Sequence, residues 1–166
     1  MTLPERMTIT TPSDREIALT RVLDAPRHLV FEAYTRPELL QRWLGVQAGW
    51  SWAVCEVDLR VGGAYRYVWR GPNRAEMGMR GVYREVAPPE RIVATEKFDQ
   101  SWYPGEAVTT VTLVERDGRT TLTLTVRYES RDARDAVLKF PPALQGVAAG
   151  FDKLAALLAT LTQERR

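Results

Sequence analysis

Apolar and polar residues alternate through the middle of the chain, and this pattern predicts a meander of antiparallel strands. In residues 64–70, Tyr65, Tyr67 and Trp69 share one face and arginines lie on the other. Residues 52–60, 77–87 and 91–98 carry similar patterns, separated by glycine and proline turns. The clearest hairpin joins 108–116 to 120–128 through Asp117-Gly118, a dipeptide that favours a two-residue turn. Together with a first strand over 16–23, these segments predict a sheet of six or seven strands.

Segments with the spacing of helices occur before, within and after this series of predicted strands. Pro26 begins a helix after the first strand, and Pro37 begins a second short one. Another short helix is predicted over 132–139, capped by Ser130 or Asp132. From Ala143 onward an apolar stripe predicts a helix of about five turns; its members are Leu144, Val147, Phe151, Leu154, Leu158 and Leu161. Only the sheet is large enough to bury that stripe, so we predict an α+β fold in which a curved antiparallel sheet surrounds a long C-terminal helix.

The first half of this C-terminal helix is rich in small residues. Gly146 and Gly150 flank Ala148 and Ala149. Glycine inside a helix costs roughly 0.5–1 kcal/mol relative to alanine, so a pair suggests a spatial reason. One reason is close packing of the helix on the sheet, and the other is space for a ligand.

Length and composition indicate one globular domain. The chain has 166 residues, of which 45% are hydrophobic and 27% charged. We expect residues 1–14 to form an N-terminal arm and 15–162 a single domain. The net charge of +2 is too small to indicate a nucleic acid partner. The single cysteine excludes an internal disulfide, and we see neither a signal peptide pattern nor a run of about eighteen apolar residues. These features predict a cytoplasmic protein without a membrane span.

Several short segments share their order and spacing with a known superfamily. They are 21–26 (RVLDAP), 37–43 (PELLQRW), 58–63 (DLRVGG), 81–86 (GVYREV), 88–91 (PPER), 120–126 and 151–154 (FDKL). In these the chain resembles the SRPBCC (START/Bet v 1-like) superfamily, specifically its heat shock protein 90 ATPase activator homologue branch. The resemblance implies a helix-grip fold with a hydrophobic cavity between sheet and long helix. It implies no single activity, because the superfamily includes lipid carriers, hormone receptors, polyketide cyclases and co-chaperone-like domains.

Two segments depart from the pattern of this branch. Residues 140–144 (FPPAL) stand where many relatives have a Gly-Met turn into the helix. Thr95-Glu96 stands where relatives often carry a tryptophan after the threonine. The second departure places a carboxylate near the implied cavity.

Glu96 is therefore the most informative polar residue. If Ile92, Ala94 and Phe98 face inward, the period of two places Glu96 inward with them. A buried carboxylate needs a partner, for which Arg80, Arg84 or a tyrosine hydroxyl is available. It could then orient a polar ligand head or act as a general base. In the opposite register Glu96 is solvated.

Two other reactive residues have plainer interpretations. His28 is the only histidine, so neither a site with several histidine ligands nor an obvious triad can form, and we expect a surface residue. Cys55 is interpreted as a small buried hydrophobic residue. We predict no metal and no cofactor.

These observations lead to three functional hypotheses. The first is a binding protein for an unidentified hydrophobic or amphipathic molecule; the second is a cyclase- or hydrolase-like enzyme using Glu96. The third, implied by the family alone, is a co-chaperone-like domain with a chaperone as partner, and a homodimer is left open. The predicted cavity residues are Trp43, Tyr65, Tyr67, Trp69, Glu96, Phe98, Trp102, Val111, Leu113, Leu124, Leu144, Val147 and Phe151.

Overall fold

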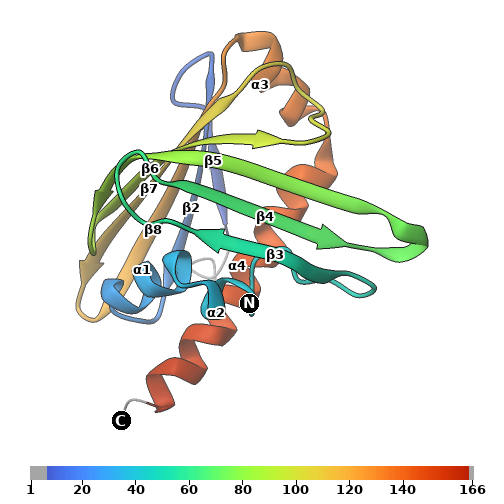
Figure 1. The fold of residues 1–166 in the computed structure, drawn as a ribbon. Helices are drawn as coiled ribbons and strands as arrows, with labels where there is room; N and C mark the ends of the chain where they lie inside the picture. Colours follow the sequence, from blue (N-terminus) through green and yellow to red (C-terminus); the bar gives the residue numbers. More distant parts are fainter. Residues whose placement is uncertain (1–6, 165–166) are drawn as a thin grey trace.

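One antiparallel sheet curves around a long C-terminal helix in the computed structural model, which describes residues 7–164 (Figure 1). The predicted α+β helix-grip arrangement is confirmed. The elements in chain order are β1 (Thr8–Thr10), β2 (Glu16–Leu23), α1 (Arg27–Thr35), α2 (Pro37–Leu40), β3 (Ser51–Val57), β4 (Ala64–Arg70), the 3-10 helix η2 (Pro72–Arg74), β5 (Glu76–Ala87), β6 (Arg91–Phe98), β7 (Ala107–Arg116), β8 (Arg119–Arg127), α3 (Arg131–Leu138) and α4 (Pro141–Glu164). The strand order is β1-β2-β8-β7-β6-β5-β4-β3.

The sheet has eight strands, so the prediction of six or seven was too low. The additional strand is β1, which pairs with β2 through Thr8↔Thr20 and Thr10↔Ala18. All three of its residues are exposed, and none contributes to the core. Alternation of buried and exposed residues therefore could not reveal β1, which lies in the segment predicted to be an arm.

The hairpin between β7 and β8 has the predicted two-residue turn. Asp117 and Gly118 both have positive φ, at 54° and 77°, between the paired residues Arg116 and Arg119. Positive φ at both central positions defines the turn type whose twist matches that of the flanking strands. This hairpin continues the sheet around α4.

The helices begin and end near the predicted residues, with two differences. Ser130 caps α3, as predicted, by accepting a hydrogen bond from the Ala133 amide at 3.0 Å. Helix α2 ends at Leu40, so Trp43 lies in the turn that follows it. Helix α4 begins at Pro141, because the first turn of a helix needs no amide donor from proline.

Helix α4 packs through its C-terminal part, residues 151–164. Its buried residues are Phe151, Leu154, Leu157, Leu158 and Leu161, all in this part of the helix. In the first half, Leu144 and Val147 remain partly exposed. The α4 backbone approaches α1, α3 and β2 (Figure 1). By length and composition alone α4 could also cross a membrane; a single apolar helix of this kind is weak evidence, since core helices share the same composition.

An ion pair links α4 to the concave face of the sheet. Arg21 of β2 is buried beside Leu122 of β8, and its guanidinium donates to the Asp152 carboxylate of α4 at 2.6 Å. The exposure of Asp152 keeps the energetic contribution of the pair small. Its geometry nevertheless fixes which face of α4 meets β2.

The two glycines of α4 have open surroundings. A methyl group added at Gly146 would meet no atom within 4 Å, and one added at Gly150 would touch only the Trp43 ring at 4.0 Å. Close packing of helix on sheet is therefore not the reason for Gly146. Neither glycine is required by the packing that the structure shows.

Candidate functional site

The inner face of the sheet carries a carboxylate at Glu96 of β6. Its neighbours at the same face of β6, Ile92 and Ala94, are buried in the core. Across the β6–β7 ladder, Glu96 pairs with the fully buried Ala107. Because side chains two apart point to the same face, Glu96 points to the inner face of the sheet. This is the register that the sequence left open.

Small residues flank Glu96 on both neighbouring strands. The pairs Arg80↔Lys97 and Tyr83↔Ala94 place Gly81 of β5 opposite Glu96, and Ala107 lies opposite it on β7. A side chain at Gly81 would overlap the Tyr65 ring and the Thr95 carbonyl oxygen. The Tyr65 ring therefore crosses β5 at the glycine, and its hydroxyl donates to the Thr95 carbonyl at 2.8 Å.

Four of the six tyrosines lie within electrostatic range of Glu96. They come from four separate parts of the chain: Tyr34 of α1, Tyr65 of β4, Tyr103 of the β6–β7 loop and Tyr128, which follows β8. Burial raises the pKa of each phenol, and the Glu96 carboxylate raises it further. All four hydroxyls are therefore protonated at neutral pH.

Glu96 has no partner for its charge. Burial raises the pKa of its carboxyl to about 7, and among residues 7–164 no hydrogen bond or ion pair to its side chain offsets this. The arginines expected as partners lie elsewhere: Arg80 pairs with Asp99 at 3.2 Å, and Arg84 is exposed. Of the alternatives Arg80, Arg84 or a tyrosine hydroxyl, the two arginines are not partners of Glu96, because residues 80 and 84 face the outer side of β5 while Gly81 and Tyr83 face inward.

A second polar group near Glu96 also lacks a partner. The Tyr103 hydroxyl is buried and makes no hydrogen bond, while the Tyr103 ring packs edge-on against Tyr128 at 5.0 Å between centroids. Buried polar groups are normally paired, so the unpaired Tyr103 hydroxyl, which lies within electrostatic range of Glu96, requires an explanation.

The thirteen predicted cavity residues fall into three groups. Most are fully buried in the core: Trp43, Tyr65, Tyr67, Trp69, Val111, Leu113 and Phe151. Glu96, Phe98, Leu124, Leu144 and Val147 are partly buried, and Trp102 is exposed. The structure brings Glu96, Phe98 and Tyr65 together. It places Trp43 in a supporting position, where its indole donates to the Ala33 carbonyl at 2.9 Å.

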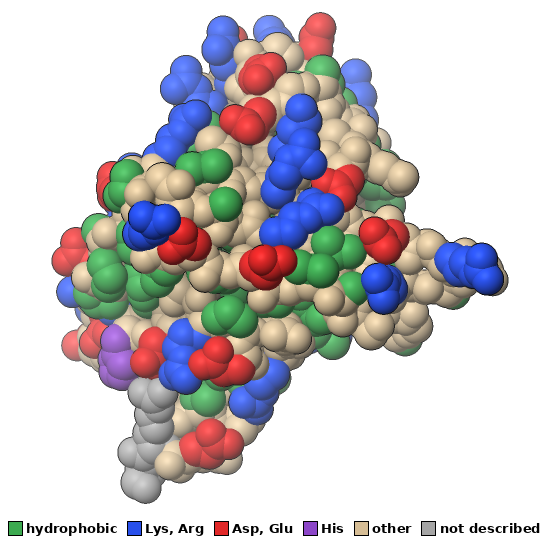
Figure 2. All heavy atoms as spheres, in the orientation of Figure 1, with side chains coloured by type: hydrophobic (Ala, Val, Ile, Leu, Met, Phe, Trp, Pro, Cys, Tyr) green, Lys and Arg blue, Asp and Glu red, His purple; other side chains and the backbone are tan. Residues whose placement is uncertain are grey.

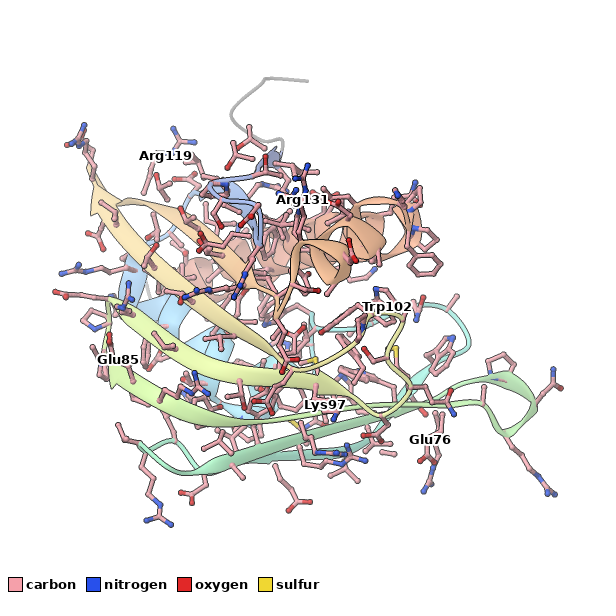
Figure 3. All side chains as sticks on the ribbon, turned by 90° about the horizontal axis from the view of Figure 1, so that it is seen from above. Glu76, Glu85, Lys97, Trp102, Arg119 and Arg131 are labelled. Atoms are coloured by element: carbon pink, nitrogen blue, oxygen red, sulfur yellow. The ribbon has the colours of Figure 1, made fainter. Side chains whose placement is uncertain are left out.

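Trp102 belongs to an aromatic cluster at one end of the sheet. Figure 3 shows it in the β6–β7 loop, on the side of α3 and α4. Its ring lies 4.6 Å from that of Phe98 and 5.8 Å from that of Phe140, between ring centroids. Phe140 directly precedes α4, so these contacts connect the loop after β6 to the beginning of the helix.

The other candidate groups stand apart from this site. His28 is exposed on α1. Burial raises the pKa of the Cys55 thiol to about 11, which keeps it protonated and makes it a poor nucleophile. Within residues 7–164, no group of three or more acidic, histidine or cysteine side chains could hold a metal ion.

Charged side chains of both signs are spread over the surface drawn in Figure 2. Acidic and basic residues are interspersed on this face of the molecule. Two hollows lie beside the second half of α4: one of about 260 Å³ near Arg42 and Lys153, and one of about 460 Å³ between α4 and the ends of β2 and β8. Glu96 and its four tyrosines line neither hollow.

Sequence reasoning missed three of the four tyrosines. Tyr128 continues the alternation of Leu122, Leu124 and Val126, so the same period could have placed it on the inner face. Tyr34 lies on the apolar side of α1, which gave a weaker signal. Tyr103 lies in an irregular loop, where no periodicity exists.

Comparison with known proteins establishes the family. The family described as "Activator of Hsp90 ATPase homolog 1-like protein" matches residues 24–159. The chain belongs to this family. Within it, Glu96 stands on the strand that follows the Pro88-Pro89-Glu90-Arg91 segment, and α4 forms the long helix.

Solved structures agree with this assignment. A protein of Rhodobacter sphaeroides is 30% identical, with a TM-score of 0.87 over 93% of this chain and 99% of that one. A protein of Chromobacterium violaceum is 31% identical, with a TM-score of 0.71 over 88% and 98%. An AHSA1-like protein of Aeromonas hydrophila shares the fold at 18% identity and a TM-score of 0.69, over 89% and 94%. A comparison with curated proteins gave no match. These similarities establish family and fold and identify no ligand.

Proposed function

We propose that this member of the Hsp90 ATPase activator homologue family binds an apolar or amphipathic small molecule. The site lies between the inner face of the sheet and the first half of α4, with Glu96 at its polar end. The observation that carries the proposal is the unpartnered Glu96 carboxylate, which faces inward among four tyrosines. An unpaired buried charge is costly, and a ligand group that pairs with it would remove that cost.

Residual exposure on the inner face supports a site at this position. Glu96 keeps part of its accessible surface although burial strongly raises its pKa, as a side chain bordering an interior opening would. Phe98, Thr109 and Leu124 on the sheet are also only partly buried, and so are Leu144 and Val147 on α4. The small residue Ala107 lies opposite Glu96 on β7 and adds little side-chain volume beside it.

A pair of variants on one strand tests the proposal. Thr109 of β7 pairs with Ala94 and Val126 on the inner face, whereas Thr110 points to the outer face. With 1-decanol as the probe and nuclear magnetic resonance shifts as the readout, wild type and Thr110→Phe should bind. Thr109→Phe should fill the site and lose binding at least about tenfold. No binding of decanol by any folded variant, or equal binding by all three, would contradict the proposal.

Catalysis is a second candidate function, supported by the acidity of Glu96. A carboxyl group with a pKa of about 7 suits a general base at neutral pH, and the nearby phenols could donate hydrogen bonds to a developing oxyanion. In that cyclase- or hydrolase-like reaction, Glu96→Gln would abolish turnover and retain substrate binding. Turnover that survives in Glu96→Gln would eliminate this candidate.

The family match supports a third candidate, association with a chaperone. The matching family is described by its likeness to an activator of the Hsp90 ATPase. Addition of this protein to Hsp90 would then raise the rate of ATP hydrolysis, independently of residue 96. An unchanged rate at a saturating concentration of the protein would eliminate it.

A further inference from the structure

We infer that the ligand's polar end is a cation, such as an alkylammonium group, that pairs with the inward-facing Glu96 carboxylate. This inference rests on the proposed binding function and specifies the class of its ligand. It depends on the charges and the aromatic side chains near Glu96.

Within residues 7–164, no basic side chain pairs with Glu96. Lys97, its neighbour in β6, points to the opposite face and is exposed. On β5, Gly81 faces Glu96, and the adjacent Arg80 is paired with Asp99 on the outer side. The first half of α4, residues 141–150, contains no charged residue. The charge of Glu96 is therefore left for a ligand to neutralise.

The tyrosines supply groups that favour a cation. Four phenol rings from α1, β4, the β6–β7 loop and the end of β8 lie within electrostatic range of the carboxylate. Aromatic rings attract cations through their negatively charged faces, so tyrosines near the carboxylate favour a cationic head over a neutral one. The Tyr65 hydroxyl already donates its proton to the Thr95 carbonyl, so its oxygen offers lone pairs only.

An anionic ligand head is disfavoured by the same surroundings. Glu96 would repel it when ionised. The buried Tyr103 hydroxyl, which makes no hydrogen bond, could donate to a neutral or anionic head. A single neutral donor does not offset an ionised carboxylate in a poorly solvated site. We therefore expect the site to bind a cationic head most tightly, a neutral head less tightly and an anionic head least tightly.

Three probes with the same ten-carbon tail test this order. Decyltrimethylammonium, 1-decanol and decanoate are titrated below their micelle concentrations at pH 8, with tryptophan fluorescence as the readout. We expect the ammonium to bind at least about tenfold more tightly than decanol, and decanoate more weakly than both. Glu96→Gln should lower the affinity for the ammonium to nearly that for decanol and leave the affinity for decanol unchanged. Glu106→Gln, at an exposed carboxylate nearby, should retain the wild-type order.

The pH dependence gives an independent readout. Among the groups facing the site, Glu96 alone titrates near neutrality, since the four phenols have raised pKa values. The preference for ammonium over decanol should therefore grow between pH 5.5 and pH 8.5 in the wild type, and stay flat in Glu96→Gln.

The outcomes separate this inference from the proposed function. If decanol binds and the ammonium binds no better, the cation inference fails and the binding function stands. An ammonium preference that persists in Glu96→Gln also overturns the inference, because another group then supplies it. If none of the three probes binds to the folded wild type, both the binding function and the inference fail.

Discussion

At the scale of single residues, the candidate site depends on the absence of a side chain at Gly81, opposite Glu96. Gly81 has no side chain, and the Tyr65 ring occupies the position where one would be. That ring reaches across β5 and hydrogen-bonds to the backbone next to Glu96. One glycine therefore determines the position of one wall of the candidate site.

Gly81→Ala should move Tyr65 and destabilise the protein. The added methyl group would overlap both the Tyr65 ring and the Thr95 carbonyl oxygen, and overpacking of this kind costs about 1–3 kcal/mol. Urea unfolding measures the loss. Tyr65→Phe in the Gly81→Ala background isolates the contribution of the displaced hydroxyl. Wild-type stability in Gly81→Ala would show that the ring has room to move.

At the scale of elements, periodicity predicted most of the fold. Strand β6 was predicted at the residues where it occurs, and the β7–β8 turn was identified from Asp117-Gly118. These elements are recognisable from the sequence because their apolar and polar residues alternate or because they contain turn residues. Strand β1 is exposed and shows neither alternation nor a turn motif, and the loop that contains Tyr103 has no periodic pattern of apolar residues. Neither was therefore predicted. The site combines residues from distant elements, which a linear pattern cannot bring together.

Helix α4 divides into a packed half and an open half, and paired truncations should show it. Phe151 is only 2% exposed, so Phe151→Ala should cost about 3–5 kcal/mol. Leu144→Ala, in the partly exposed first half, should cost well under half of that. Thermal unfolding of both variants provides the comparison. Equal losses would mean that the two halves are packed alike.

The glycine in the open half should be replaceable with a gain in stability. Gly146 is exposed, helical and surrounded by open space. Gly146→Ala should raise the free energy of unfolding by roughly 0.5–1 kcal/mol, because alanine loses less backbone entropy in a helix. Urea unfolding would detect this gain, and a loss of stability would contradict the open surroundings of Gly146.

At the scale of the whole molecule, Glu96 couples global stability to pH. Its carboxyl has an ordinary pKa of 4.5 and a folded pKa of about 7. Below pH 4.5 it is protonated in both states. Between these values the unfolded chain releases the proton while the native state retains it, so this group lowers stability as pH rises. Above pH 7 the loss is complete, at about 3 kcal/mol.

Glu96→Gln should remove this dependence. The variant should match the wild type near pH 4 and exceed it at pH 8 by up to about 3 kcal/mol, because glutamine does not ionise. Chemical unfolding of both proteins at each pH cancels the contributions of other groups. Parallel stability profiles for the two proteins would show that Glu96 is solvated in the native state.

The position of Glu96, between Gly81 and Ala107 in the middle of a fully paired sheet, has a consequence for how such a protein changes over evolutionary time. Exchange of this one side chain alters the charge offered to a ligand while the backbone ladder and the packed half of α4 stay as they are. Recognition can therefore diverge by single mutations that do not threaten folding. In protein design, substitution of residue 96 by glutamine, histidine or lysine could give the same scaffold different ligand preferences.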